Sequence, residues 1–124
     1  MQKKVLLVED DEDNRALVSF VLRSAHLDVT LLTAEDGKQG LEIAFAHLPD
    51  LILMDMEMPV MDGWVTVPTL RADTRTAAVP VVALTARARP EDRQRTKEIG
   101  CIEHMSKPVV PDELIALVKR YLQI

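Results

Sequence analysis

The chain has 124 residues, the usual size of one globular domain, and its 48% hydrophobic and 28% charged content excludes a disordered or membrane-embedded chain. Its net charge of −5 argues against nucleic acid as a direct partner, because binding phosphates requires a basic face. A single cysteine cannot form an intramolecular disulfide, and the start "MQKKVLLVED" has too few apolar residues for a signal peptide, so we expect a cytoplasmic protein without membrane insertion.

Short apolar runs, each suited to a buried strand, alternate along the chain with amphipathic segments. The predicted strands are Val5–Val8, Val29–Leu32, Leu51–Met54, Val79–Leu84 and, more weakly, Cys101–Met105. Runs that are apolar throughout are typical of strands covered on both faces, and the segments between them have the length of helices. The pattern therefore predicts an α/β fold, with βαβ units forming a parallel sheet between helices on both faces.

Helical patterns occupy the segments between these runs. In the first segment, apolar residues recur at Leu17, Phe20 and Val21, and this stripe is expected to face the core. The same spacing recurs within residues 37–46. The last helix is expected to begin at Pro111, because proline suits the first position of a helix.

Two of the predicted helices fit their pattern less well. Pro68 lies inside the third, "GWVTVPTLRAD", where a proline removes a backbone hydrogen bond and should kink or shorten the helix. The fourth, "PEDRQRTKEIG", is nearly all polar and offers mainly Ile99 to the core. We therefore expect the fourth helix to dock weakly and to be mobile.

Reactive or charged side chains stand at the ends of the predicted strands. They are Glu9 and Asp10 after the first strand, Asp55 after the third, Thr85 after the fourth and Lys107 after the fifth. Parallel strands end at one edge of a sheet, where ligands of this fold class bind. Clustered carboxylates need a cation or a proton to coexist, and oxygen ligands without histidine or cysteine favour Mg²⁺. With a hydroxyl and an ammonium group nearby, the pattern predicts a site for one small phosphoryl group.

Each of these residue types also has an ordinary interpretation. The acids of residues 11–13 suit a helix N-terminus, and Asp62-Gly63 is typical of a turn. Thr85 alone is typical of a strand end, and Lys107 alone is typical of a solvated surface. The conjunction favours a site, because each suitable side chain follows a different strand.

Four motifs give the chain a family resemblance over essentially its whole length. They are "KVLLVEDDEDNR", "PDLILMDMEMPVMDG", "VPVVALTA" and "SKP". In content, order and spacing the sequence resembles the receiver domain of bacterial two-component response regulators, and most closely the single-domain regulators of phosphorelays. The resemblance implies a flavodoxin-like, doubly wound fold: a five-stranded parallel sheet of order 2-1-3-4-5 with five helices on its two faces.

The resemblance also implies a role for each acid of the motifs. Asp55 is expected to accept a phosphoryl group from a histidine kinase or a histidine phosphotransfer protein. Asp10 is expected to bind Mg²⁺ directly and Glu9 to help through water. The backbone carbonyl of Glu57 and the Asp55 carboxylate are expected to complete the protein ligands.

Lys107 and Thr85 complete the implied site. Lys107 would pair with the phosphoryl group, Thr85 would turn its hydroxyl onto it, and the Lys107–Pro108 bond would be cis. Such a site acts mainly by positioning and charge neutralisation, since phosphoryl transfer needs little covalent chemistry from the protein.

Two positions carry hypotheses about how the switch responds. His104 stands where members of the family often have Tyr or Phe. Its ordinary interpretation is a packed histidine, and the hypothesis is a ring that rotates in place of the aromatic residue and adds pH sensitivity. Arg87, two residues after Thr85, is expected to face Glu57, two residues after Asp55. This pair is expected to gate water and to set the lifetime of the phosphoryl group.

Two surfaces are expected to contact other proteins. Asn14 and Arg15, beside the acids, are expected to meet the phosphodonor. Arg89 and Arg93 belong to a basic fourth-helix region, which is either a solvated face or part of an output surface. In this family the fourth helix, fifth strand and fifth helix commonly form that surface, and a downstream effector protein is the expected partner.

The leading prediction is a signalling switch rather than a turnover enzyme, in one receiver domain over residues 1–124 without an output domain. A phosphatase with an aspartyl-phosphate intermediate would need a second acid, for which Glu57 is the nearby candidate, and a cap. A flavin-binding module would need a Ser/Thr/Gly-rich loop after the first strand. A scaffold that has lost phosphorylation would not need the acids, Thr85 and Lys107.

Overall fold

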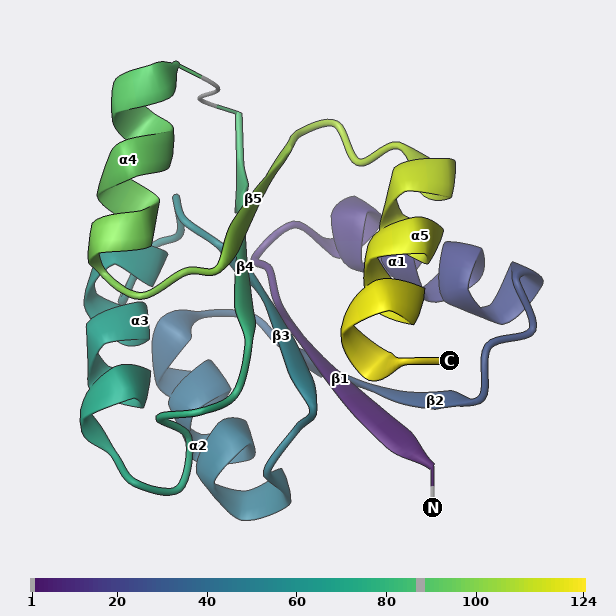
Figure 1. Cartoon of the computed structure of the whole chain (residues 1–124), viewed down its shortest axis with the longest axis horizontal. Helices are drawn as coiled ribbons and strands as arrows, with labels where there is room; N and C mark the ends of the chain where they lie inside the picture. The colour runs from purple at the N-terminus through teal and green to yellow at the C-terminus, as the bar shows by residue number, and fades with distance from the viewer. Residues whose placement is uncertain (1, 87–88) are drawn as a thin grey trace.

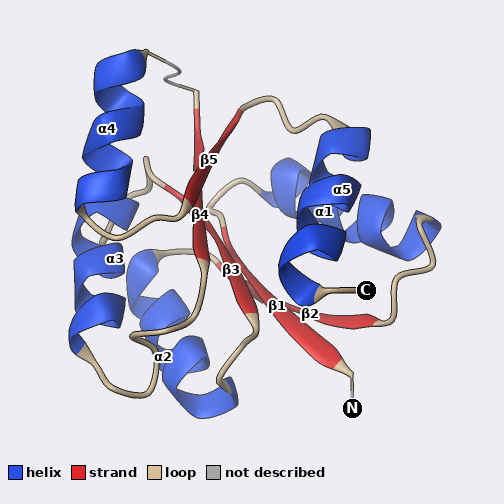
Figure 2. Cartoon of the chain, viewed as in Figure 1, coloured by secondary structure: helices blue, strands red, loops and turns tan. Residues whose placement is uncertain are grey.

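The structure, a computed structural model, describes residues 2–86 and 89–124, and this part of the chain alternates strands and helices throughout. The elements are β1 (Lys3–Val8), α1 (Glu12–Ser24), β2 (Val29–Ala34), α2 (Gly37–His47), β3 (Leu51–Asp55), α3 (Gly63–Ala72), β4 (Val81–Thr85), α4 (Pro90–Glu98), β5 (Glu103–Ser106) and α5 (Pro111–Leu122). The strands form one parallel sheet of order β2-β1-β3-β4-β5 (Figures 1 and 2), which confirms the predicted fold.

Two apolar layers cover the sheet, because side chains of a strand point alternately to its two faces. In β1, Val5 and Leu7 pack toward α1 and α5, whereas Leu6 and Val8 pack toward α2 and α3. Figure 1 shows α1 and α5 together on one side of the sheet and α2, α3 and α4 on the other. Every residue of β3 and β4 is buried, which explains why these strands are apolar up to their last residue.

Helix α1 buries Val21 of the stripe that was expected to face the core, but not Leu17 or Phe20. Leu17 and Phe20 are exposed, with 62% of the Phe20 surface open to solvent, so the prediction that they face the core is wrong. The buried residues are Val18, Val21 and Leu22. An α-helix with apolar residues on more than one side allows two stripes, and here the aliphatic one packs against the sheet.

Helix α3 runs through Pro68 rather than ending there. It begins after Asp62, whose carboxylate accepts a hydrogen bond from the Val65 amide, and it continues for 10 residues. Pro68 is exposed, so its ring lies on the solvent side, where a missing backbone hydrogen bond is least harmful. The expected shortening of this helix is therefore wrong.

Helix α4 buries polar side chains. Its buried residues are Asp92 and Thr96, and Ile99 at its C-terminal end packs in part against the core, as expected. The Thr96 hydroxyl donates to the Arg93 carbonyl, and Asp92 accepts from the Arg89 side chain. The mobility expected for α4 stays a prediction.

Arg71, near the end of α3, joins three segments at the edge of the sheet opposite the carboxyl ends of the strands. Its guanidinium donates to the carbonyls of Gly100, Thr76, Ala77 and Val79, at distances between 2.6 and 3.4 Å. Beside it, Cys101 is a buried free thiol, and burial raises its pKa to about 11. In the described part of the chain, no helix is both long and apolar enough to cross a membrane.

Candidate phosphoacceptor site

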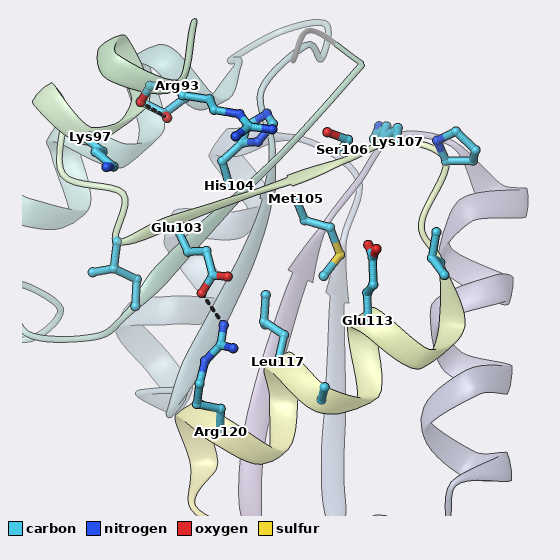
Figure 3. A pocket seen from close by; sticks show the side chains of 15 residues that line it. Arg93, Lys97, Glu103, His104, Met105, Ser106, Lys107, Glu113, Leu117 and Arg120 are labelled. Atoms are coloured by element: carbon cyan, nitrogen blue, oxygen red, sulfur yellow. Dashed lines mark hydrogen bonds and ion pairs between the residues drawn. The ribbon is translucent and has the colours of Figure 1, made fainter. Parts of the chain in front are cut away.

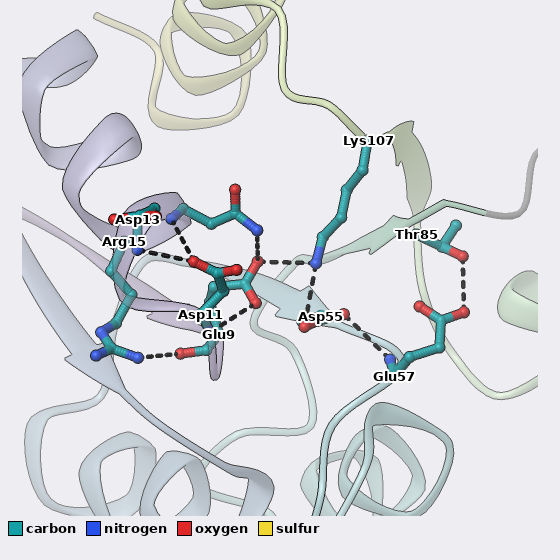
Figure 4. A network of polar contacts seen from close by, with 9 residues as sticks. Glu9, Asp11, Asp13, Arg15, Asp55, Glu57, Thr85 and Lys107 are labelled. Carbon is teal, nitrogen blue, oxygen red and sulfur yellow. Dashed lines mark hydrogen bonds and ion pairs between the residues drawn. The ribbon is translucent and has the colours of Figure 1, made fainter.

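The carboxylates gather because β1 and β3 are neighbours in the sheet. Val8 pairs with Met54, so Glu9 and Asp55, one residue further along each strand, emerge side by side at the carboxyl edge. Both are buried, each with 1% of its surface exposed, while Asp10 is exposed. One carboxylate oxygen from each of the three acids lies within 4.8 Å of the others. Figure 4 shows Glu9 and Asp55 with their polar contacts.

Lys107 reaches this cluster from the loop after β5. Its ammonium nitrogen lies 2.8 Å from Glu9 Oε1 and 3.1 Å from Asp55 Oδ2, so one cation is shared by two buried acids. Its backbone amide donates to the Thr85 carbonyl, which ties this loop to the end of β4. The Lys107–Pro108 peptide bond is cis.

Glu9 is held by a further set of donors from the start of α1. Its carboxylate accepts from the side-chain amide of Asn14 and from the Asp11 backbone amide, both at 3.3 Å. The Arg15 guanidinium donates to the Glu9 carbonyl at 2.8 Å and lies 3.6 Å from Glu35. Asn14 and Arg15 therefore direct polar groups at Glu9, and contact of either residue with a phosphodonor stays a prediction.

Asp55, Glu57 and Thr85 are linked at the other side of the cluster. The Glu57 amide donates to Asp55 Oδ1 at 3.1 Å, and the Thr85 hydroxyl donates to Glu57 Oε1 at 2.9 Å. The hydroxyl of Thr85 is thus directed at Glu57 in this arrangement. Arg87, expected to face Glu57, lies outside the described residues.

The pKa values of Asp55, Glu9 and Lys107 are shifted by burial and by the contacts among these three groups. Burial raises the pKa of Asp55 to about 8, and the adjacent Glu9 adds to this rise, while the Glu57 amide and Lys107 oppose it. Burial also acts to raise the pKa of Glu9, but its contacts with Asp55 and Lys107 hold it below the usual range. Burial lowers the pKa of Lys107, and the two acids more than reverse this effect. The cluster is therefore short of positive charge.

The donor set fits Mg²⁺. Two buried carboxylates and one exposed carboxylate offer hard oxygen ligands, and the group of three contains no histidine or cysteine. The acids line a hollow of about 290 Å³, whose walls also include Asn14, Glu57, Ala86 and Lys107. Ala86 was not anticipated as part of the site, although a small residue directly after Thr85 leaves the entrance open.

His104 and Arg93 line a second, larger hollow on the neighbouring face. This groove, of about 880 Å³, lies between α4, β5 and α5 (Figure 3). The expected output surface therefore contains a real concavity, and Lys107 lines both hollows. Arg89 does not line the groove; its side chain binds Glu91 and Asp92. The proposed ring rotation and pH sensitivity of His104 stay predictions.

The comparisons with known proteins agree with this geometry. Residues 5–119 match the family model described as the response regulator receiver domain. The chain is 34% identical over 122 residues to the polar-differentiation response regulator DivK of Brucella anthropi, covering 98% of both chains. It also superposes on the chemotaxis response regulator CheY4 of Vibrio cholerae with a TM-score of 0.89 and 32% identity, covering 98% of this chain and 99% of that one.

A third relative bears on the metal. The receiver domain of sensor histidine kinase PA1611 from Pseudomonas aeruginosa PAO1 shares 34% identity and a TM-score of 0.85, with complete coverage of both chains. Its crystal structure has a magnesium ion coordinated in the active site cleft. The fold, the acidic site and these matches define a phosphoacceptor module of two-component signalling.

The chain belongs to the response regulator receiver domain family. As a member it is a signalling switch rather than a turnover enzyme, which sets aside the phosphatase and flavin-binding alternatives. Membership also implies a histidine kinase system as the source of the phosphoryl group.

Proposed function

We propose that this receiver domain accepts a phosphoryl group on Asp55, with a phosphohistidine of a histidine kinase or histidine phosphotransfer protein as the donor. The observation that carries the proposal is the position of Asp55. It is a buried carboxylate at the end of a rigid central strand, in contact with Lys107 and within reach of two further acids.

In the proposed step, a carboxylate oxygen of Asp55 forms a bond to phosphorus while the phosphorus–nitrogen bond of the donor breaks. The electron pair of that bond returns to the ring, so an imidazole whose other nitrogen carries a proton leaves as the neutral base, and the product is an acyl phosphate on Asp55. Strand β3 fixes the attacking oxygen, because its neighbours β1 and β4 hold it on both sides. The Lys107 ammonium offsets the charge of the incoming group.

Asp10, Asp55 and the Glu57 carbonyl would hold the metal ion, with Glu9 assisting through water. When bound, Mg²⁺ would supply positive charge that the cluster lacks and would neutralise oxygens of the transferred group. Asn14 and the Asp11 amide keep the Glu9 carboxylate aimed into the hollow.

The proposed output begins at Thr85. An acyl phosphate on Asp55 brings new acceptor oxygens near the Thr85 hydroxyl, which now donates to Glu57. Movement of Thr85 and the adjoining loop would change the groove between α4, β5 and α5, where His104 and Arg93 lie. On this proposal residues 1–124 act as one cytoplasmic receiver domain that signals by binding a downstream effector protein.

The proposal can be tested with Mg²⁺ and acetyl phosphate as a small phosphodonor, followed by intact-protein mass spectrometry. We expect one added phosphoryl group that survives acid and is lost in base, as an acyl phosphate should be. The Asp55→Asn variant should take up none, whereas Asp28→Asn, which changes an exposed acid remote from the site, should behave as wild type. Absence of the adduct from the wild type, or its survival in Asp55→Asn, would contradict the proposal.

A further inference from the structure

Arg95 of α4 lies over the indole ring of Trp64, the second residue of α3. The guanidinium carbon is 4.6 Å from the ring centroid, a distance typical of a cation–π contact. Figure 1 shows α4 beside α3 on the same side of the sheet. Within α4, Asp92 and Thr96 are buried, and Ile99 at its C-terminal end packs in part against the core, so the contact with Trp64 adds to a small set of attachments.

Trp64 follows Gly63, which packs against the segment that contains Asp55 and Met56. Its neighbour Gly63 packs so closely that an added Cβ would lie 2.6 Å from Met56 Sδ and 2.9 Å from the Asp55 carbonyl. The Gly63 amide also donates to the Met56 carbonyl. The start of α3 is thus hydrogen-bonded to Met56 and packs closely beside the backbone of Asp55 and Met56, so a shift of α3 is transmitted to this segment.

The contacts form a continuous path from α4 to the site. Arg95 touches Trp64, Gly63 beside it touches Asp55 and Met56, and the Glu57 amide binds the Asp55 carboxylate. At the end of this path the Thr85 hydroxyl is on Glu57 and Lys107 is shared by Glu9 and Asp55. These last three contacts define what we call the resting arrangement.

We propose that Arg95 is a positioning residue that acts through Trp64 to hold α4 and the start of α3 in the resting arrangement, and so slows phosphorylation of Asp55. The inference rests on the proposed function and extends it to regulation of that site. A contact that is stronger in the resting arrangement than in the arrangement that accepts the phosphoryl group lowers the population of the latter. A cation–π contact at an exposed site corresponds to about a two- to fivefold change in that population.

The test compares Arg95→Gln and Arg95→Lys with wild type, and uses Arg23→Gln as a matched control. Arg23 is an exposed arginine in the last turn of α1, so the control removes the same charge and side chain from a helix away from Trp64. The first measurement is hydrogen exchange of the amides of α4 and of residues 56–63, without a phosphodonor. The second is the rate of phosphoryl uptake from acetyl phosphate with Mg²⁺. The third is the emission of Trp64, the single tryptophan of the chain, during that uptake.

We expect Arg95→Gln to raise amide exchange both in α4 and in residues 56–63, and to take up the phosphoryl group about two- to fivefold faster. Arg95→Lys should fall between Arg95→Gln and wild type, since lysine keeps a weaker cation–π contact, and Arg23→Gln should match wild type. Trp64 emission should change during uptake in the wild type and change less in Arg95→Gln. Loss of a nearby positive charge would by itself slow reaction with an anionic donor, so a faster rate cannot come from charge alone.

Two results would overturn the inference: unchanged exchange of residues 56–63 in Arg95→Gln, or an uptake rate equal to or below that of Arg23→Gln. A variant that is only less stable would raise exchange throughout the chain, which also contradicts a specific path. If the wild type takes up no phosphoryl group, the proposed function and the regulatory role both fail. The exchange measurement still decides whether the path from Arg95 to residues 56–63 exists.

Discussion

Lys107 at the carboxyl edge of the sheet is shared by two buried carboxylates, whereas Arg71 at the opposite edge donates five hydrogen bonds to uncharged backbone carbonyls. The five hydrogen bonds of Arg71 all go to backbone carbonyls, which are fixed dipoles. Around Lys107 the acids outnumber the cation. The first arrangement holds loops together, and the second is left in need of a further positive charge.

The backbone conformation also differs between the turn at Gly100, near Arg71, and the turn at Val60, near the site. Near Arg71 the chain turns through a positive φ of 115° at Gly100, which has no Cβ to be strained. Near the site it turns through a positive φ of 69° at Val60, a β-branched residue that is 83% exposed. The Met61 amide donates to the Pro59 carbonyl across this turn, and the Gly37 amide binds the Met61 carbonyl. In the described part of the chain, a β-branched residue with a positive φ therefore lies in the loop beside the site, whereas the other non-glycine residues with a positive φ, His26, Leu48 and Gln123, follow the C-terminal ends of helices.

The largest effect on the free energy of unfolding is expected from removing Arg71. Arg71→Ala should lower the free energy of unfolding by about 3 kcal/mol, because five hydrogen bonds to a charged group are lost and carbonyls are left unpaired. Urea denaturation measures the loss. Arg75→Ala, which removes an exposed ion pair with Asp73, should lower it far less, because solvent screens the pair. If Arg71→Lys keeps full stability, the charge of Arg71 rather than its planar fork of donors holds this edge together.

Asp55→Asn, at the carboxyl edge of the sheet, should instead raise the free energy of unfolding. Because burial and Glu9 raise the pKa of Asp55 from 3.8 to about 8, the folded protein keeps a proton that the unfolded chain loses near pH 4. The wild type therefore loses stability as pH rises from about 4 to about 8, and the variant does not share this loss. Without divalent cations at pH 8, we expect Asp55→Asn to be more stable by about 2 kcal/mol, and the gain should shrink toward pH 4.

Urea denaturation of both proteins across this pH range, with a chelator present, provides the measurement. Asp50→Asn is a matched control at an exposed acid that accepts a hydrogen bond from the Lys4 amide. A gain in stability that does not vary with pH would show that the charge of Asp55 is not its source.

Added Mg²⁺ should supply the missing charge and so stabilise the wild type. At a free concentration ten times its dissociation constant, the gain in unfolding free energy should be about 1.4 kcal/mol. Asp10→Asn and Asp55→Asn should lose most of this gain, while Arg71→Lys should keep it, because Arg71 lies at the opposite edge. Thermal unfolding with and without Mg²⁺ distinguishes these cases, and an equal gain in all variants would indicate binding elsewhere.

The smallest expected effect on stability comes from relieving the backbone strain at Val60. Val60→Asn should raise stability by about 1 kcal/mol, because asparagine tolerates a positive φ better than a β-branched residue does. Val65→Asn is the matched control, since Val65 is exposed on α3 and has an ordinary helical backbone. That control should be neutral or slightly destabilising. A loss of stability in Val60→Asn would mean that the valine side chain, not its backbone, matters at this turn.

Much of the fold could be predicted from the sequence because the strands are continuous apolar runs. The residues at which the strands begin and end could not. The fourth run was expected from Val79, yet β4 begins at Val81, after Pro80, which has no amide to donate. The fifth was expected over Cys101–Met105, and β5 spans Glu103–Ser106. Helix α1 shows the same limit for orientation, since its periodicity allows two stripes and only packing selects one.

The candidate site was predictable in kind because its acids, hydroxyl and lysine each follow a strand, and parallel strands end together. The sequence gives no such guide for long side chains that contact groups distant in the chain. Asn14 and Arg15 turn toward Glu9, and Arg71 gathers carbonyls from distant turns. The contact of Arg95 with Trp64 depends on two helices that are far apart in the sequence.

The buried thiol of Cys101 has a practical consequence for probing the molecule. It is 4% exposed and its pKa is about 11, so at neutral pH it presents almost no thiolate, the form that reacts with alkylating reagents. Maleimides should therefore leave the wild-type chain largely unlabelled. A cysteine introduced at an open position such as Phe20 or Val60 should take a spin label or fluorophore selectively, with Trp64 already in place as a second optical reporter.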